Sequence, residues 1–182
     1  MDAPEFTKAL AHARLPEERI KWFGALLRRE ARTAVEIVGG SAVGIYLTSA
    51  AYVSQDVDLV GEHGKIEPVL HRWRFRRNEG RSHRYYWFHK EVGLVDLVGS
   101  TDHSGLPPRE LATPYGPVLV GAPEPLIVRR LARSSREGSD ELFKQAVLLA
   151  KMEDLDWEYL RGEARYERVE SLLDKVQRAR RK

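Results

Sequence analysis

Apolar residues recur at helical spacing near both ends of the sequence and alternate with polar residues between them. Residues 1–34 carry two apolar stripes separated by Pro16, and we expect two short helices there. Helical stripes return after Pro123. The pattern therefore predicts N-terminal helices over 1–34, a β-rich core over 35–121 and a C-terminal helical region over 122–182.

The central stretch has the period-two alternation of half-buried strands. Strands are predicted at 35–38, 56–60, 73–76, 83–88, 94–98 and 118–120. Helices are predicted at 41–50, with Ser41 as its cap, and at 65–71. The strands 73–76 and 83–88 form a predicted hairpin that turns at 78–80, and the rest of 100–121 is expected to be loop. Strands mixed with crossover helices predict an α/β (α+β) fold with a mixed sheet flanked by helices.

Composition limits the class of protein. The chain has 182 residues, 42% of them hydrophobic and 31% charged, which is typical of a globular domain. No apolar run approaches the roughly 20 residues of a membrane span, and the first residues lack the pattern of a secretory signal. With no cysteine, disulfides and thiolate metal sites are excluded. We expect a cytoplasmic protein with no membrane partner.

Basic residues are concentrated in the predicted hairpin, although the net charge is only +3. Residues 72–90 contain one acidic residue, Glu79, and seven arginines or lysines: Arg72, Arg74, Arg76, Arg77, Arg81, Arg84 and Lys90. The alternation places arginines on one strand face and Trp73 and Phe75 on the other. Two interpretations are open: the aromatics stack on RNA bases while the arginines bind phosphates, or the aromatics are core and the arginines are solvated. The RNA interpretation predicts contacts from Arg72, Arg74, Arg76 and Arg84.

One set of residues suggests phosphate and metal chemistry. A predicted strand ends at Gly39-Gly40-Ser41 and opens a helix, whose free N–H groups and positive dipole end attract phosphate. Asp56 and Asp58 are one residue apart and therefore share a strand face. With Asp96 they form three carboxylates, and Mg²⁺ prefers such oxygens together with substrate phosphates.

Each part of this set is a weak signal alone, because Gly-Gly-Ser turns and solvated Asp-x-Asp pairs are common. Asp96 is harder to explain as surface chemistry. Its neighbours are Leu94, Val95, Leu97 and Val98, which predicts a strand buried on both faces. A buried carboxylate needs a cation, an arginine or a metal, so the metal interpretation is favoured.

Together, Gly39-Gly40-Ser41, Asp56-Val57-Asp58 and Val95-Asp96-Leu97 resemble the DNA polymerase β-like nucleotidyltransferase superfamily, in particular the minimal bacterial proteins related to AbiEii-type toxins of type IV toxin–antitoxin systems. The resemblance implies that Gly39, Gly40 and Ser41 hold a triphosphate and that Asp56 and Asp58 are metal ligands. Asp96 would be the third ligand and would activate the acceptor hydroxyl. Arg130 stands where a lysine is common in the family, with Arg129 beside it, and the resemblance implies that these arginines bind the nucleotide and neutralise its triphosphate.

The expected activity follows from this resemblance. It is Mg²⁺-dependent or Mn²⁺-dependent transfer of a nucleoside monophosphate from an NTP to a hydroxyl of RNA, with tRNA favoured, or of a protein. A toxin role would add an antitoxin partner. The alternative is a catalytically silent nucleotide-binding or RNA-binding module of a toxin–antitoxin pair.

Overall fold

The structure is a computed structural model that describes residues 1–48, 54, 56–79 and 85–180. Contacts divide the chain into two units, Met1–Gly121 and Ala122–Lys182. The helices of the first unit are α1 (Ala3–Ala11), α2 (Pro16–Ala31), α3 (Gly39–Leu47) and α4 (His63–Arg72). Its strands are β1 (Val35–Val38), β2 (Asp56–Gly61), β3 (Arg76–Glu79), β4 (Tyr85–His89), β5 (Gly93–Gly99), β6 (Arg109–Leu111) and β7 (Val118–Val120). The second unit holds α5 (Pro123–Glu137), α6 (Asp140–Leu149), α7 (Trp157–Tyr166) and α8 (Glu170–Ala179).

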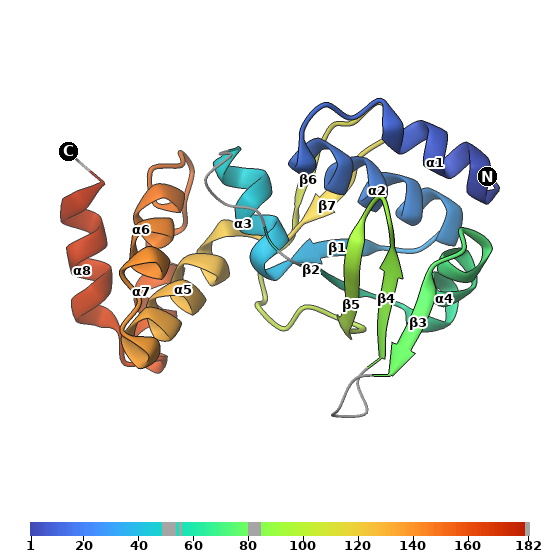
Figure 1. Ribbon diagram of the computed structural model, residues 1–182. Coiled ribbons are helices and arrows are strands. Elements are labelled where there is room, and N and C mark those ends of the chain that lie inside the picture. Colours follow the sequence, from blue (N-terminus) through green and yellow to red (C-terminus); the bar gives the residue numbers. More distant parts are fainter. Residues whose placement is uncertain (49–53, 55, 80–84, 181–182) are drawn as a thin grey trace. The chain divides into compact units, whose positions relative to one another are not determined.

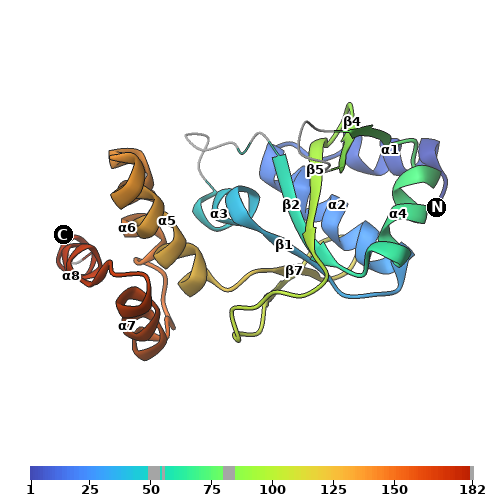
Figure 2. The same cartoon turned by 90° about the horizontal axis from the view of Figure 1, so that it is seen from below.

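The strands form one seven-stranded sheet in the order β3-β4-β5-β2-β1-β7-β6 (Figure 1). The pairs β2–β5 and β1–β7 are parallel, and the other pairs are antiparallel. Figure 2 shows β2 and β5 side by side, next to β1. The predicted mixed α/β architecture is confirmed, with helices before and after the sheet in the sequence.

Helices cover one face of this sheet. Helix α2 packs on β1 and β7, and its Gly24 allows a close approach: an added Cβ would lie 2.8 Å from both Ile37 Cδ1 and Val118 Cγ2. Helix α4 places the His71 ring edge-on against Trp87 of β4, with ring centroids 4.7 Å apart. Between these elements and α1 lies an aromatic core in which Phe6 stacks on Trp73 at 4.1 Å.

The hairpin exists, but its first strand begins later than predicted. Residues 73–75 form a left-handed exit from α4, in which Arg74 has φ 63°. The Arg74 N–H donates to the His71 carbonyl (2.9 Å) and the Phe75 N–H to the Leu70 carbonyl (3.0 Å). Such an exit buries alternate residues as a strand would, which explains the wrong prediction of a strand at 73–76. The predicted turn at 78–80 overlaps β3, and residues 80–84 lie outside the described part of the chain.

Three further predictions need correction. Helix α3 begins at Gly39, whose φ of 63° makes a sharp corner directly after β1, so Ser41 lies in its first turn and is not the cap. Residues 109–111 were predicted to be loop but form strand β6. This strand is only three residues long and depends on its pairing with β7, so its own sequence carries no strand pattern. Strand β5 is not buried on both faces, since Leu94 is 38% and Val98 48% exposed.

The second unit is a group of helices around its own apolar core. Buried Glu124 of α5 accepts a hydrogen bond from the Asp156 N–H (2.9 Å), while the Asp156 carboxylate caps α7 by accepting from the Glu158 N–H (3.0 Å). Arg180 lies over the Trp157 ring at 4.3 Å. None of the described helices, in either unit, is both long and apolar enough to cross a membrane.

Gly24→Ala should destabilise the protein, although alanine is the better helix former. The added methyl meets two buried side chains, and such overpacking costs about 1–3 kcal/mol of unfolding free energy. The matched control is Gly162→Ala at an exposed position of α7, where the new Cβ meets nothing within 4 Å and should stabilise the protein by up to about 1 kcal/mol. Urea unfolding measures both; equal shifts would contradict the close packing of α2 on the sheet.

His89 should make stability fall at mildly acidic pH. Burial lowers the pKa of His89 below its ordinary 6.5. The charge of Lys90 lowers this pKa further, while the charge of Glu91 raises it. The His89 Nδ1 accepts a hydrogen bond from the Glu91 N–H (3.2 Å). Below pH about 6.5 the unfolded chain therefore binds the proton more readily, and the stabilisation is lost as pH falls through the folded pKa. Unfolding free energies measured from neutral to acidic pH should decline less steeply in His89→Gln; identical slopes would contradict the assignment.

Candidate functional site

The register of two strands, β2 and β5, brings the predicted acids onto one sheet face. Asp58 of β2 is paired with Asp96 of β5, and Asp56 with Leu94. Directly opposed residues on neighbouring strands point to the same side, and Asp56 and Asp58 alternate with Val57. Val57 is buried on the helix-covered face, so all three carboxylates belong to the opposite face.

Gly39 forms the turn between β1 and α3, next to Asp58. Val38 is paired with Asp58 across β1 and β2, and the next residue, Gly39, turns the chain into α3. A Cβ at this position would lie 2.8 Å from the Asp58 Cγ. Glycine is therefore required both by the positive φ and by the contact with the Asp58 carboxylate.

The serines near the acids are already engaged. Ser41 is buried and its hydroxyl donates to the Asp56 carbonyl oxygen (2.6 Å), which ties the first turn of α3 to the start of β2. Gly40, half-buried, lies in the same first turn. Ser54, which was not predicted as a site residue, donates from its hydroxyl to Asp56 Oδ1 (3.2 Å). Its position two residues before Asp56 was the only signal for it.

The acids differ in exposure. Asp96 is buried, with 8% of its surface exposed, while Asp56 and Asp58 are half-buried. In the described part of the chain, no group of three or more His, Asp or Glu side chains is arranged to hold a metal ion. The backbone thus presents three carboxylates on one face, while Asp56 is turned to Ser54 and Asp58 to Gly39.

The carboxylate face continues across the hairpin as two cross-strand rows. In the first row, Asp58 and Asp96 are followed by Tyr86 and Asn78. In the second, Asp56 is followed by Leu94, Phe88 and Arg76. Phe88 is 40% and Leu94 38% exposed, so apolar surface remains open beside the acids. The sequence pattern alone did not indicate Tyr86 or Phe88 as site residues, because their face depends on the register with β5.

The predicted basic positions have different surroundings. Arg72 pairs with Glu30 at 2.9 Å, and Arg74 and Arg76 are exposed. Trp73 and Phe75 are buried, so these two aromatics are core and do not stack on RNA. Arg84 lies outside the described residues.

The arginines predicted to neutralise the triphosphate lie on α5 in the second unit. Arg129 is exposed, and Arg130 is buried, with 6% of its surface exposed. Their role in nucleotide binding stays a prediction.

Two solved structures are similar to this chain in fold. No family model and no curated protein sequence matches it. An antigenic nucleotidyltransferase-like protein from Paracoccidioides brasiliensis is similar in structure, with a TM-score of 0.61, 15% identity, and coverage of 90% of this chain and 93% of that protein. The antibiotic-resistance factor ANT(2'')-Ia has a TM-score of 0.53 and 17% identity, over 98% of this chain and 99% of its own. At these identities the likeness is one of fold, and it confirms the predicted nucleotidyltransferase-type fold.

Gly39→Ala should destabilise the protein more than a positive φ alone explains. The control, Gly138→Ala, has φ 65° and open space around its new Cβ, so it should lose only the left-handed backbone term of about 1–2 kcal/mol. At Gly39 the methyl must also displace the Asp58 carboxylate, which adds about 1–3 kcal/mol. Chemical unfolding of both variants measures the difference. Equal losses would show that Gly39 and Asp58 are not in close contact.

Proposed function

We propose that this protein transfers a nucleoside monophosphate from an NTP to an acceptor hydroxyl, with release of pyrophosphate. The observation that carries the proposal is the placement of Asp56, Asp58 and Asp96 on one open sheet face, directly in front of the Gly39 corner. Nucleotidyltransferase-like neighbours in fold support it by analogy.

The proposed roles follow from position. Gly39 and Gly40 bring the start of α3 close to the acids, and the free N–H groups of that helix would bind the triphosphate. Ser41 would support this loop through the Asp56 carbonyl. Asp96, the most buried acid, would accept the proton of the attacking hydroxyl.

The three carboxylates suit a hard cation such as Mg²⁺ or Mn²⁺ in donor type and in sharing one face. Asp56 and Asp58 would hold it after rotating away from Ser54 and Gly39, and Asp96 would complete the ligand set. A bound divalent ion supplies charge neutralisation of the phosphates and a lower pKa for the attacking hydroxyl. Arg129 and Arg130 would add positive charge for the triphosphate.

RNA, with tRNA favoured, is the proposed acceptor, because exposed Arg76 lies on the hairpin that continues the carboxylate face and exposed Arg74 lies shortly before that hairpin. A protein hydroxyl is the other acceptor considered. A type IV toxin role, with an antitoxin partner, is the cellular setting that the sequence resemblance suggests.

A second candidate is a catalytically silent nucleotide-binding or RNA-binding module. The observation that favours it is the lack, among the described residues, of an assembled three-ligand metal group. Incubation with labelled NTP therefore has to distinguish transfer from binding.

Asp58→Asn and Asp96→Asn should abolish transfer. Purified protein is incubated with each α-³²P-labelled NTP, Mg²⁺ or Mn²⁺, and total tRNA, and label on tRNA or on protein is measured. Loss of one carboxylate ligand should lower the rate about a hundredfold or more. The control, Asp174→Asn at an exposed position of α8, should keep the wild-type rate. Nucleotide binding without transfer in the wild type would favour the silent module, and full activity of Asp58→Asn would refute the mechanism.

A further inference from the structure

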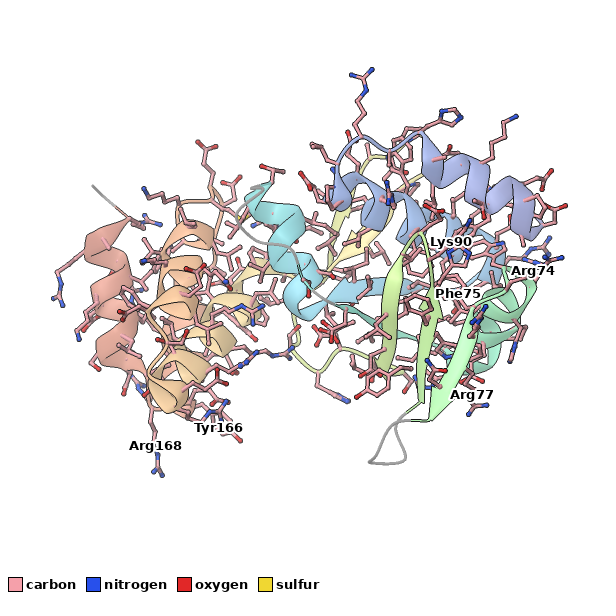
Figure 3. All side chains as sticks on the ribbon, in the orientation of Figure 1. Arg74, Phe75, Arg77, Lys90, Tyr166 and Arg168 are labelled. Atoms are coloured by element: carbon pink, nitrogen blue, oxygen red, sulfur yellow. The ribbon has the colours of Figure 1, made fainter. Side chains whose placement is uncertain are left out.

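A basic cleft lies beside the hairpin end that is nearest to α1. It has a volume of about 600 Å³ and lies between α1, the exit from α4 and the ends of β3 and β4. Its charged lining residues are Lys8, Arg74, Arg76 and Lys90, and its aromatic ones are Trp73, Phe88 and His89. Figure 3 shows Arg74 and Lys90 at this end of the hairpin.

The cleft has the charge of an anion site. All four ionised side chains that line it are cations, and all four are exposed. Lys90 lies 3.7 Å from Glu91, a carboxylate that is not part of the lining. Four cations around one apolar floor attract a ligand that carries several negative charges.

Arg74 occupies a backbone position that favours glycine. It follows the end of α4 with φ 63°, and the hydrogen bonds from the Arg74 and Phe75 N–H groups close the helix. A side chain in this left-handed conformation costs about 1–2 kcal/mol. The left-handed φ by itself does not single out Arg74, because Arg32 (φ 52°) and Arg168 (φ 59°) share it. Arg74 differs from Arg168 in lining a cleft together with three other cations.

Two residues of the cleft lining, Arg76 and Phe88, belong to the carboxylate face. Their cross-strand row continues through Leu94 to Asp56. Neighbouring strands are about 4.8 Å apart, so Phe88 lies about 10 Å from Asp56 across two steps. A polymeric ligand held in the cleft can therefore reach the acids along one row of side chains.

We propose that this cleft binds single-stranded RNA, with phosphates on Arg74, Arg76, Lys8 and Lys90 and a base stacked on Phe88. Its use for the acceptor strand rests on the proposed nucleotidyl transfer; the RNA site itself does not. RNA fits better than an acidic peptide because it supplies both regularly spaced anions and flat rings for the exposed Phe88.

The test is binding of a short fluorescein-labelled oligouridylate, measured by anisotropy without NTP or divalent metal over about 50–300 mM salt. Arg74→Gly should weaken binding about fivefold near 0.1 M salt and reduce the slope of log K against log salt by about 0.7. Phe88→Ala should weaken it about fivefold to a hundredfold with little change in slope. Arg74→Gly should also leave the unfolding free energy equal or higher, because glycine suits φ 63°.

The controls come from the second unit. Arg168 has φ 59° and closes α7 with the same two hydrogen bonds, from the Arg168 N–H to the Arg165 carbonyl and from the Val169 N–H to the Ala164 carbonyl. Tyr166 is an aromatic that is 81% exposed (Figure 3). Arg168→Gly and Tyr166→Ala should bind the oligouridylate as the wild type does.

The outcomes separate this inference from the proposed activity. Loss of RNA binding in the cleft variants alone supports the site, even if no nucleotide is transferred. Equal losses in the controls, unchanged binding in Arg74→Gly and Phe88→Ala, no RNA binding at all, or stronger cleft-dependent binding of an oligoglutamate peptide would each overturn it.

Discussion

The register of β2 between β1 and β5 is the constraint on which the core and the candidate site both depend. Pairing with β1 sets Val38 opposite Asp58 and so brings Gly39 against that carboxylate, while pairing with β5 sets Asp96 opposite Asp58. A slip of one residue would turn the acids into the helix-covered face, where Val57 and Leu59 are now buried. Burying unpaired charge there costs several kcal/mol, so packing of the apolar face fixes the positions of the carboxylates.

The features that sequence could predict are those with local causes. Asp56 and Asp58 share a face because alternate residues of any strand do, and Gly39-Gly40 after an apolar strand indicates a tight corner wherever it occurs. The β–α order and the helices at both ends follow from periodicity. The strand order of the sheet has no such local cause. The expectation that Asp96 stands beside Asp58 depended on resemblance to a known fold, and the register between β2 and β5 confirms their adjacency.

The wrong predictions share a physical origin in contacts distant along the chain. Residues 73–76 alternate like a strand because a left-handed helix exit also buries every second residue. Such an exit usually has glycine at its left-handed position, and here that position is Arg74, so the sequence does not indicate the end of the helix. Strand β6 has three residues and exists through its pairing with β7. The exposure of Leu94 could not be predicted either, since an apolar residue on an uncovered sheet face looks in sequence like core.

Charge on the hairpin has a second explanation, protection of the sheet edge, and it accounts for only part of the pattern. Strand β3 is an edge strand, and charged side chains such as Arg76 and Arg77 prevent pairing with another chain. Arg74 precedes the strand and presents no free edge, so edge protection gives no reason for a guanidinium in a left-handed turn. Phe88 lies on β4, which is paired on both sides, and an exposed aromatic there adds apolar surface without protecting any edge. Both residues line the same cleft, so a ligand with phosphates and flat rings would contact them together.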